Sequence, residues 1–273
     1  MGKFDGILLC TDLDGTLFRN DKTISRENIE AIEYFKREGG YFTFVTGRMP
    51  FFVSDVLEAV KPNAPFGCVN GAGVFDGEKQ EYVCKTIMSE QVLELVEHAD
   101  QSFSDLGIQV NTFERTYFSR ENETMKNFRR RTKLENLVCP YHEVKEPIAK
   151  IVFGSEIIED IQRLEQILKA HPLAEDFDFI RSEKNLYEIL SKGCCKGTAI
   201  KNLCAYLQVD VAKSIAIGDY NNDISMFEAA GVGIAVSNAC REALDAADFV
   251  TVSNEENAIA KVISDLEDGK YQI

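Results

Sequence analysis

The chain has fewer basic than acidic residues, and it has no long apolar run. Its 273 residues include 45 acidic and 30 basic side chains, which gives a formal net charge of −15 at pH 7. Nucleic acid and anionic membrane surfaces are therefore poor partners for it. No uninterrupted apolar stretch approaches the roughly 20 residues that a membrane-spanning helix needs. A phosphorylated small molecule remains compatible with this charge, because a bound cation and a few local basic groups can set the sign inside a site.

The sequence also lacks a cysteine spacing that would indicate disulfides or a zinc site. Eight cysteines are present. Cys10, Cys68 and Cys204 lie in apolar stretches, where free cysteine acts as a small hydrophobic residue. The adjacent Cys194 and Cys195 match neither a zinc knuckle nor a thioredoxin-type motif. No targeting segment is recognisable, because the N-terminal apolar run is too short for a signal-peptide core. We therefore expect reduced thiols and a cytoplasmic location.

Common nucleotide-binding and calcium-binding motifs are absent as well. The P-loop pattern G-x-x-x-x-G-K-[ST] does not occur. A calcium loop beginning at Asp12 would need glycine where Leu17 stands and glutamate where Thr23 stands. Gly231 and Gly233 lack the third glycine of a dinucleotide fingerprint and follow a predicted helix. The histidines are scattered without metal-ligand spacing, and we expect them at the surface or in an inserted domain: His98, His142 and His171.

The N-terminal part of the chain alternates buried strands with helices. Apolar runs over 7–10, 41–45 and 66–69 predict strands that are buried on both faces. Ser25 can cap a helix between the first two strands, and a shorter helix should join the second strand to the third. Strand, helix, strand, helix, strand with short connections predicts a parallel, doubly wound sheet.

The pattern changes over residues 83–187. A long helix over 89–106 is followed by strands such as 108–113 and 150–153, and continuous apolar runs become fewer. Strands with one wet face are typical of an antiparallel sheet that carries helices on its other side. We expect this segment to be an α+β domain inserted into the first one.

The parallel pattern resumes at residue 188. A helix should begin at Lys196 and Gly197. Three further apolar segments predict strands: 214–217, 233–236 and 249–252. The predicted fold class is α/β, a Rossmann-like doubly wound parallel sheet formed by residues 1–82 and 188–273 with an inserted α+β domain.

A group of polar residues stands where the predicted strands end or helices begin: Asp12, Asp14, Thr46, Lys196, Asp219, Asn222 and Asp223. Because the carboxyl ends of parallel strands open on one edge of a sheet, these residues can converge. Asp12, Asp14 and Asp219 offer the hard oxygen ligands that Mg²⁺ prefers. Thr46 and Lys196 could hold phosphoryl oxygens. Together they supply the parts for phosphoryl transfer: a carboxylate nucleophile, a second acid/base, a metal and a cation.

Four segments carry these residues: Asp-Leu-Asp-Gly-Thr at 12–16, Val-Thr-Gly-Arg at 45–48, Lys-Gly at 196–197 and Gly-Asp-Tyr-Asn-Asn-Asp at 218–223. In order and spacing, over nearly the full length, the chain resembles haloacid dehalogenase (HAD) superfamily phosphatases of the Cof-type (type IIB capped) sugar-phosphatase branch. The resemblance implies a HAD-like core, an inserted α+β cap, a Mg²⁺ cofactor and a small phosphorylated metabolite, such as a sugar phosphate, as substrate.

The resemblance also implies a role for each site residue. Asp12 would attack phosphorus and form an aspartyl-phosphate, while Asp14 would act as acid toward the leaving oxygen and then as base toward water. Asp12, the backbone carbonyl of Asp14, and Asp219 would bind Mg²⁺. Asp223 would position Lys196 or a metal-bound water. The phosphoryl group would be bound by Leu13, Thr46, Gly47, Lys196 and Asn222.

Two other functions stay open on the sequence. A phosphomutase shares this motif set and cap type by resemblance, but it returns the phosphoryl group to the sugar instead of to water. A regulatory protein could retain phosphate and metal binding without turnover, although a binding module does not need an acid such as Asp14.

The remaining charged residues are ambiguous. Arg48 is as readily a structural ion-pair partner as a site residue, and the run 129–131 of three arginines is typical of a solvated helix face. Cap residues such as Asn111, Arg115 and Arg120 are candidates for substrate selection.

Overall fold

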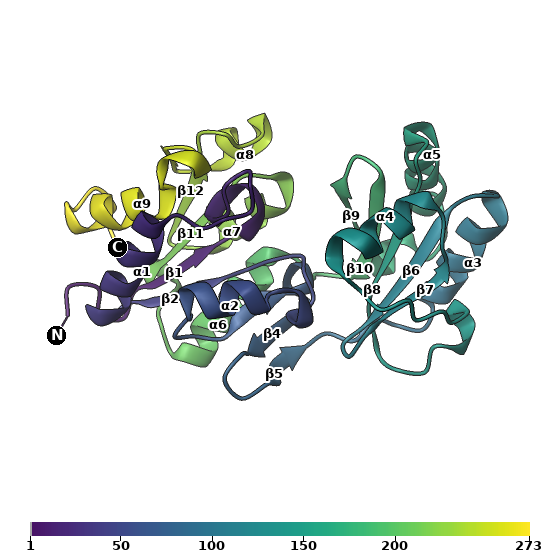
Figure 1. Ribbon diagram of the computed structural model, residues 1–273, viewed down its shortest axis with the longest axis horizontal. Coiled ribbons are helices and arrows are strands. Elements are labelled where there is room, and N and C mark those ends of the chain that lie inside the picture. Colours follow the sequence, from purple (N-terminus) through teal and green to yellow (C-terminus); the bar gives the residue numbers. More distant parts are fainter. Residues whose placement is uncertain (1) are drawn as a thin grey trace. The chain divides into compact units, whose positions relative to one another are not determined.

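The computed structural model describes residues 2–273 and divides the chain into two compact units. The first unit contains the residues up to Lys85 together with Cys195–Ile273, and the second unit contains Thr86–Cys194 (Figure 1). Within residues 2–273, no helix is both long enough and apolar enough to cross a membrane.

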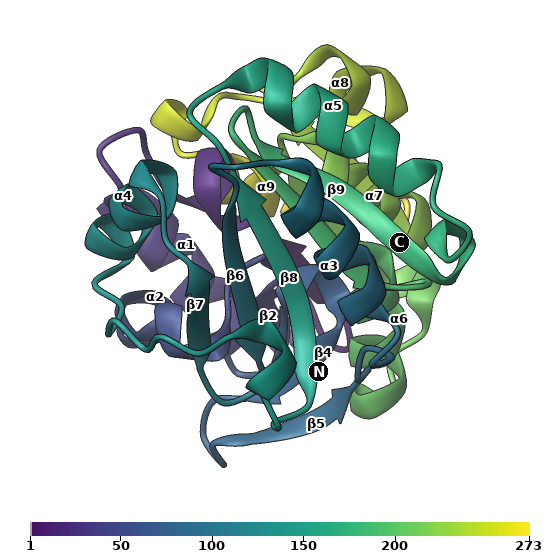
Figure 2. The same cartoon turned by 90° about the vertical axis from the view of Figure 1, so that its right-hand side faces the viewer.

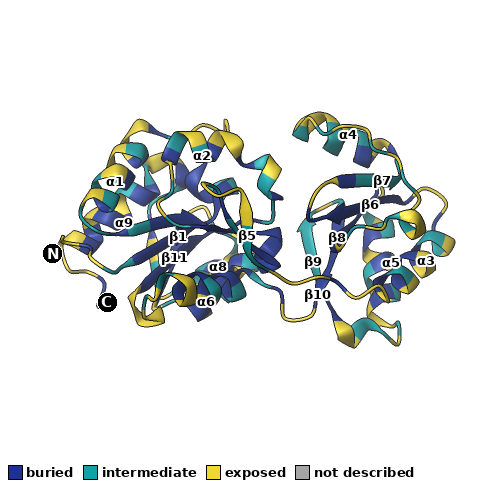
Figure 3. Ribbon diagram, turned by 90° about the horizontal axis from the view of Figure 1, so that it is seen from below, coloured by how far each residue is buried: buried dark blue, intermediate teal, exposed yellow. Residues whose placement is uncertain are grey.

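The first unit is built on a five-stranded sheet in the order β13-β12-β11-β1-β2. Every pair of neighbouring strands in it is parallel. The strands are β1 (Leu8–Thr11), β2 (Tyr41–Phe44), β11 (Ser214–Gly218), β12 (Val232–Val236) and β13 (Phe249–Thr251). β1, β11 and β12 are buried throughout, and Figure 3 shows β1 and β11 in dark blue. The predicted α/β class with a parallel sheet is confirmed.

Helices cover both faces of this sheet. The helices of the first unit are α1 (Arg26–Arg37), α2 (Ser54–Val60), α6 (Lys196–Leu207), α7 (Ile224–Ala229), α8 (Arg241–Ala246) and α9 (Ala258–Glu267). α6, α7 and α8 share one apolar cluster with Leu8 and Cys10 of β1 and Ala216 of β11. The buried residues of α1 and α9, such as Phe35 and Val262, lie outside that cluster, and these two helices contact each other. The sheet is therefore doubly wound.

Local sequence explains where α1 begins. Ser25 is its N-cap, and the Ser25 hydroxyl oxygen accepts a hydrogen bond of 3.2 Å from the backbone N–H of Asn28. Such a cap satisfies one of the amides that an α-helix leaves unpaired at its start. The predicted cap is confirmed.

The third predicted strand does not join the parallel sheet as a full member. β3 (Phe66–Cys68) pairs antiparallel with β4 (Gly73–Asp76), which pairs with β5 (Glu81–Lys85). Only a single parallel bridge, between Val45 and Gly67, connects β3 to the chain that follows β2. The predicted third strand therefore runs parallel to the segment that follows β2, but it pairs with that segment at one bridge and belongs to the separate sheet β3-β4-β5.

The second unit is a five-stranded antiparallel sheet in the order β7-β6-β8-β10-β9. Its strands are β6 (Gly107–Thr112), β7 (Thr116–Arg120), β8 (Ile148–Gly154), β9 (Phe177–Glu183) and β10 (Leu186–Ser191). Its helices are α3 (Val92–Ser102), α4 (Glu123–Thr132) and α5 (Ile158–Lys169). The α+β composition predicted for this segment is confirmed, although the long helix predicted over 89–106 is shorter because Phe103 is already extended.

Helices lie on both faces of the antiparallel sheet. α3 and α5 lie on one face of the sheet, as Figure 2 shows. Their buried residues share an apolar cluster with Ile151 of β8 and Tyr187 of β10. Met125 of α4 packs against Val152 and Leu186, whose side chains point to the opposite face because strand residues alternate. The basic run of α4 is exposed or half-buried, and Arg129 and Arg131 pair with Glu121 and Glu183, as expected for a solvated helix face.

The unit boundaries differ from the predicted ones. The predicted start at residue 83 falls inside β5, which belongs to the first unit, and the predicted return at residue 188 falls inside β10 of the second unit. β10 is buried at every position, its polar residues Glu188 and Ser191 included, so it lacks the wet face expected of a strand in the inserted domain.

Candidate active site

The carboxyl ends of β1, β2 and β11 lie next to one another in the parallel sheet. The backbone N–H of Asp12 donates to the carbonyl of Ile217 in β11 over 2.8 Å, and the N–H of Val45 donates to the carbonyl of Thr11 over 2.9 Å. These bonds place the residues that follow β1, β2 and β11 at one edge of the sheet. Ligands of open α/β sheets bind at such an edge.

The loop Leu13–Leu17 after β1 needs its glycine. Gly15 has a φ of +85°, and a Cβ atom there would lie 2.4 Å from the Asp219 Oδ2 atom. The Thr16 hydroxyl donates to the Asp219 Oδ1 atom over 3.0 Å. Gly15 therefore allows the loop to approach the carboxylate of Asp219, and Thr16 orients that carboxylate.

Lys196 is the first residue of α6, and its side chain is 1% exposed. Its Nζ atom lies 2.5 Å from Asp12 Oδ1 and 2.5 Å from Asp223 Oδ1. A cation at a helix N-terminus is ordinarily unfavourable, and these two carboxylates offset that cost. Burial works to lower the pKa of Lys196, but Asp12 and Asp223 outweigh it and hold the pKa well above its usual value. Lys196 is therefore charged.

Asp223 is fully buried and is held by backbone groups. Its Oδ2 atom accepts hydrogen bonds from the N–H groups of Asp219, over 2.9 Å, and Tyr220, over 3.0 Å. Its Oδ1 atom accepts from Lys196. With both oxygens in use, Asp223 orients the ammonium group and the chain around Asp219.

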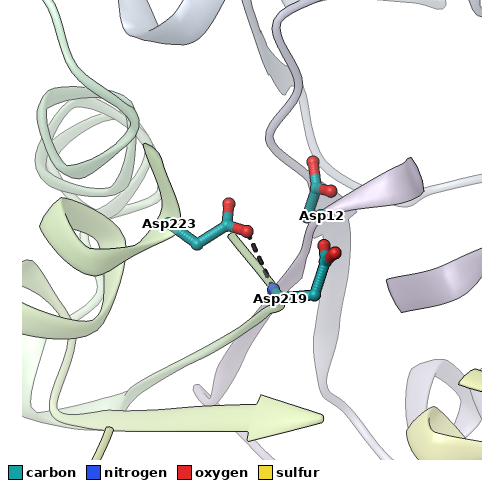
Figure 4. A group of neighbouring side chains, drawn as sticks. All are labelled: Asp12, Asp219 and Asp223. Atoms are coloured by element: carbon teal, nitrogen blue, oxygen red, sulfur yellow. Dashed lines mark hydrogen bonds between the residues drawn. The ribbon is translucent and has the colours of Figure 1, made fainter. Parts of the chain in front are cut away.

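The carboxylates of Asp12, Asp219 and Asp223 offer ligand atoms that all lie within 4.8 Å of one another (Figure 4). When all three carboxylates are ionised, they exceed the one ammonium of Lys196 by two negative charges, which a divalent cation would balance. Asp12 and Asp219 keep carboxylate oxygens that Lys196 and Thr16 do not occupy. Hard oxygen donors of this kind suit Mg²⁺, so the residues fit the predicted metal.

The same crowding perturbs the acidity of the two candidate ligands. Burial, the largest influence, raises the pKa of Asp12 to about 8, while Lys196 opposes the rise and Asp223 and Asp219 add to it. Burial also raises the pKa of Asp219 to about 6, with Asp223 contributing. A bound cation favours the ionised form of both groups.

Asp14 faces a different set of charges. Arg48 donates to both of its oxygens, from Nε over 3.0 Å and from Nη2 over 2.7 Å, and Lys22 Nζ lies 2.9 Å from Asp14 Oδ1. Burial works to raise the pKa of Asp14, but Arg48 and Lys22 outweigh it and hold the pKa below its usual value. Arg48 is thus an ion-pair partner of Asp14, which is the residue predicted to act as acid and base.

The predicted phosphate-binding residues lie on neighbouring loops. Thr46 is 2% exposed, and its hydroxyl oxygen accepts a hydrogen bond of 3.2 Å from the N–H of Arg48. The side chain of Leu13 is completely buried, so any phosphate contact of Leu13 would come from its backbone. Asn222 donates from Nδ2 to Asn70 Oδ1 over 3.2 Å. A Cβ atom at Gly47 would lie 3.0 Å from the same Asn70 oxygen.

Three residues of this region were missed as site residues in the sequence analysis: Thr16, Lys22 and Asn70. Asn70 lies two positions after the end of β3, whereas Asp12 and Asp219 directly follow their strands, and this place near a strand end was the available signal. Lys22 carried no signal, because its contact with Asp14 depends on the loop path. The cap candidates are engaged within the second unit: Asn111 with Gln109 and Thr116, Arg115 with Glu146, and Arg120 with Asp100.

Comparison with known proteins covers nearly the whole chain. The model of the haloacid dehalogenase-like hydrolase family matches residues 9–263. Phosphatase YwpJ of Bacillus subtilis (strain 168) is 27% identical over 284 residues, which cover 95% of this chain and 99% of YwpJ. The 5-amino-6-(5-phospho-D-ribitylamino)uracil phosphatase YwtE of the same organism is 28% identical over 296 residues, covering 96% of this chain and 99% of YwtE.

Two solved structures show the same fold. TM0651 from Thermotoga maritima superposes with a TM-score of 0.82 at 25% identity, covering 94% of this chain and 96% of that chain. The HAD subclass IIB sugar phosphatase BT4131 superposes with a TM-score of 0.83 at 21% identity, covering 95% of this chain and 98% of that chain.

Proposed function

Since the chain belongs to the haloacid dehalogenase-like hydrolases, we propose that it is a Mg²⁺-dependent phosphatase of small phosphorylated metabolites that works through an aspartyl-phosphate on Asp12. The observation that carries the proposal is the contact of Lys196 with Asp12 beside the carboxylate of Asp219. A carboxylate that can act as a nucleophile, a fixed cation and carboxylate oxygens of the kind that bind Mg²⁺ stand together at the ligand-binding edge of the sheet.

In the first step a carboxylate oxygen of Asp12 forms a bond to phosphorus, and the bond between phosphorus and the ester oxygen breaks. The leaving oxygen takes a proton from Asp14. In the second step a water oxygen attacks phosphorus, Asp14 takes the proton of that water, and the Asp12 carboxylate leaves with release of orthophosphate. Lys196 stays charged and balances the phosphoryl oxygens throughout.

Mg²⁺ bound by Asp12, Asp219 and the backbone carbonyl of Asp14 would supply Lewis-acid stabilisation of the phosphoryl charge. Asp14 changes between acid and base in this scheme. Its contacts with Arg48 and Lys22 favour the carboxylate form, which is the base of the second step. To act as an acid in the first step, Asp14 has to bind a proton, and the protonated oxygen then no longer accepts from Arg48 or Lys22.

We propose sugar or polyol phosphates as the substrate class. The support comes from the relatives, since the name of YwtE describes a phosphorylated ribityl chain and BT4131 is described as a sugar phosphatase. The second unit would select among such esters, in the role of the cap. A cytoplasmic location is part of the proposal and rests on the cysteine contexts in the sequence.

The decisive test of the function is Asp12→Asn. With Mg²⁺ and p-nitrophenyl phosphate or a panel of sugar phosphates, this variant should lose at least about 1,000-fold in kcat, because the amide is not a nucleophile. Asp265→Asn is the matched control, because Asp265 is also a buried aspartate paired with lysines, namely Lys261 and Lys270, but lies on α9. Wild-type turnover by Asp12→Asn would refute the mechanism.

Hydrolysis is separated from phosphomutase activity by the fate of the phosphoryl group. In ¹⁸O water, wild-type protein acting on a sugar monophosphate should release orthophosphate that carries the label. An isomeric sugar phosphate without labelled orthophosphate would instead identify a mutase.

A further inference from the structure

The turn after β3 is held in an unusual backbone conformation. Val69, Asn70 and Gly71 have φ values of 52°, 51° and 94°. For a β-branched residue such as Val69 a positive φ is a real outlier, and such strain persists only where surrounding contacts determine it. The turn is buried, with Asn70 1% exposed.

Backbone hydrogen bonds fix this turn to the loop after β2. The N–H of Asn70 donates to the carbonyl of Thr46 over 3.0 Å, and the N–H of Val69 donates to the carbonyl of Arg48 over 3.0 Å. The turn also lies against the start of α6, because a Cβ atom at Gly71 would stand 1.8 Å from the carbonyl oxygen of Cys195. The turn therefore contacts the backbone beside both Thr46 and Lys196.

The side chain of Asn70 completes this arrangement. Its Oδ1 atom accepts the 3.2 Å hydrogen bond from Asn222 Nδ2. The same oxygen lies 3.0 Å from the position that a Cβ atom on Gly47 would take. One carboxamide thus contacts the segment of Thr46 and Gly47 and the segment of Asn222, which are remote from each other in the sequence.

We propose that Asn70 is a positioning residue for phosphate binding: it orients the carboxamide of Asn222 and closes the side of Gly47. The inference rests on the proposed function, which places Asn222 and Gly47 at the phosphate. An asparagine suits the position because it tolerates the left-handed backbone and brings a hydrogen-bond acceptor.

The test uses Asn70→Gly, since glycine keeps the left-handed backbone and removes only the side chain. Asn257→Gly is the matched control. Asn257 also has a left-handed backbone, with a φ of 64°, and its Oδ1 atom accepts one hydrogen bond, from Arg19, but it lies at the start of α9. Both variants replace asparagine by glycine, so the gain in conformational entropy of the unfolded chain is the same in each.

Orthophosphate affinity, measured calorimetrically with Mg²⁺ present, should fall about ten-fold in Asn70→Gly, the effect of losing about one hydrogen bond. It should stay within about two-fold of wild type in Asn257→Gly. KM for p-nitrophenyl phosphate should rise by a similar factor with a smaller change in kcat, as expected for lost uniform binding. Unchanged phosphate affinity in Asn70→Gly would overturn the inference.

A double-mutant cycle tests whether Asn70 acts through Asn222. In an Asn222→Ala background, Asn70→Gly should weaken phosphate binding by less than about two-fold, because the group it orients is gone. An equal ten-fold loss in both backgrounds would contradict this route.

A spectroscopic readout keeps the inference separate from the proposed function. The side-chain amide of Asn222 should exchange with solvent at least about ten-fold faster in Asn70→Gly than in wild type or Asn257→Gly. If wild-type protein neither binds nor releases phosphate, the proposed function fails. The exchange rate of the Asn222 amide still decides whether Asn70 orients it, and equal rates in all three proteins would overturn that.

Discussion

The Nζ atom of Lys196 lies 2.5 Å from Asp12 Oδ1, although 184 positions separate the two residues in the chain. The same ammonium group contacts Asp223 at 2.5 Å. This pairing places a permanent positive charge against the residue that would attack phosphorus. When Asp12, Asp219 and Asp223 are all ionised, they leave the site two negative charges in excess of this ammonium, which is the charge that a divalent cation balances.

Replacing this lysine should affect both stability and binding. Lys196→Met removes the cation from two buried carboxylates, and breaking a buried pair in this way costs about 3–5 kcal/mol of unfolding free energy. Orthophosphate binding should be lost as well. Denaturant unfolding and calorimetry measure the two effects. Lys150→Met is the control, because Lys150 forms a buried pair with Glu188 in the second unit: it should lose stability and keep orthophosphate affinity. Retained phosphate binding in Lys196→Met would contradict the assigned role.

Stability should depend on pH and on Mg²⁺ together. The raised pKa values of Asp12, about 8, and Asp219, about 6, mean that the folded protein binds more protons than the unfolded chain between about pH 4 and pH 8. Metal-free protein should therefore lose stability as the pH rises through this window. Mg²⁺ should replace those protons, so the increase in Tm that it produces should be larger at about pH 8 than at about pH 5. An equal increase at both pH values would count against Asp12 and Asp219 as the ligands.

The ion pair of Asp14 with Arg48 should set part of the pH–rate profile. Arg48→Met removes the stronger of the two cationic partners, so the pKa of Asp14 should rise. The limb of the kcat profile that Asp14 governs should then move to higher pH. Lys22→Met should move it in the same direction by less, because Lys22 gives Asp14 one contact where Arg48 gives two. A profile unchanged in both variants would remove Asp14 from the acid/base role.

The close approach of Gly15 to Asp219 gives a geometric prediction. In Gly15→Ala the new Cβ would stand 2.4 Å from Asp219 Oδ2, in addition to the strain of a φ of +85°. The Mg²⁺ concentration for half-maximal activity should rise at least about ten-fold as the carboxylate is displaced. Gly6→Ala has a similar φ of +75° with no atom within 4 Å, so it should show the backbone strain of about 1–2 kcal/mol alone and normal Mg²⁺ dependence. Identical Mg²⁺ curves for the two variants would show that Asp219 does not hold the metal.

The convergence of the site could be predicted because parallel topology imposes it. Asp12 and Asp219 each follow a buried apolar strand, and all such strands open on one edge of the sheet. Lys196 could be placed beside them because a lysine at a helix start needs an anion nearby. These inferences need only the order of the elements along the chain.

Other features depend on contacts that no local pattern contains. The pairing of Asp14 with Lys22 and Arg48 is set by the paths of two separate loops. Asn70 and Gly71 are typical of a turn with positive φ, but no local pattern shows that the backbone after β2 holds this turn. The end of the inserted unit was misplaced because β10 is buried on both faces of an antiparallel sheet, where a strand with one wet face is the usual case.

The aspartyl-phosphate itself is the most direct test of the account. During turnover of p-nitrophenyl phosphate with Mg²⁺, rapid quenching followed by borohydride should reduce the acyl-phosphate, and mass spectrometry should then find homoserine at position 12 alone. Trapping at Asp14 or Asp219 instead, or turnover without any trapped aspartate, would contradict the assignment of Asp12 as the nucleophile.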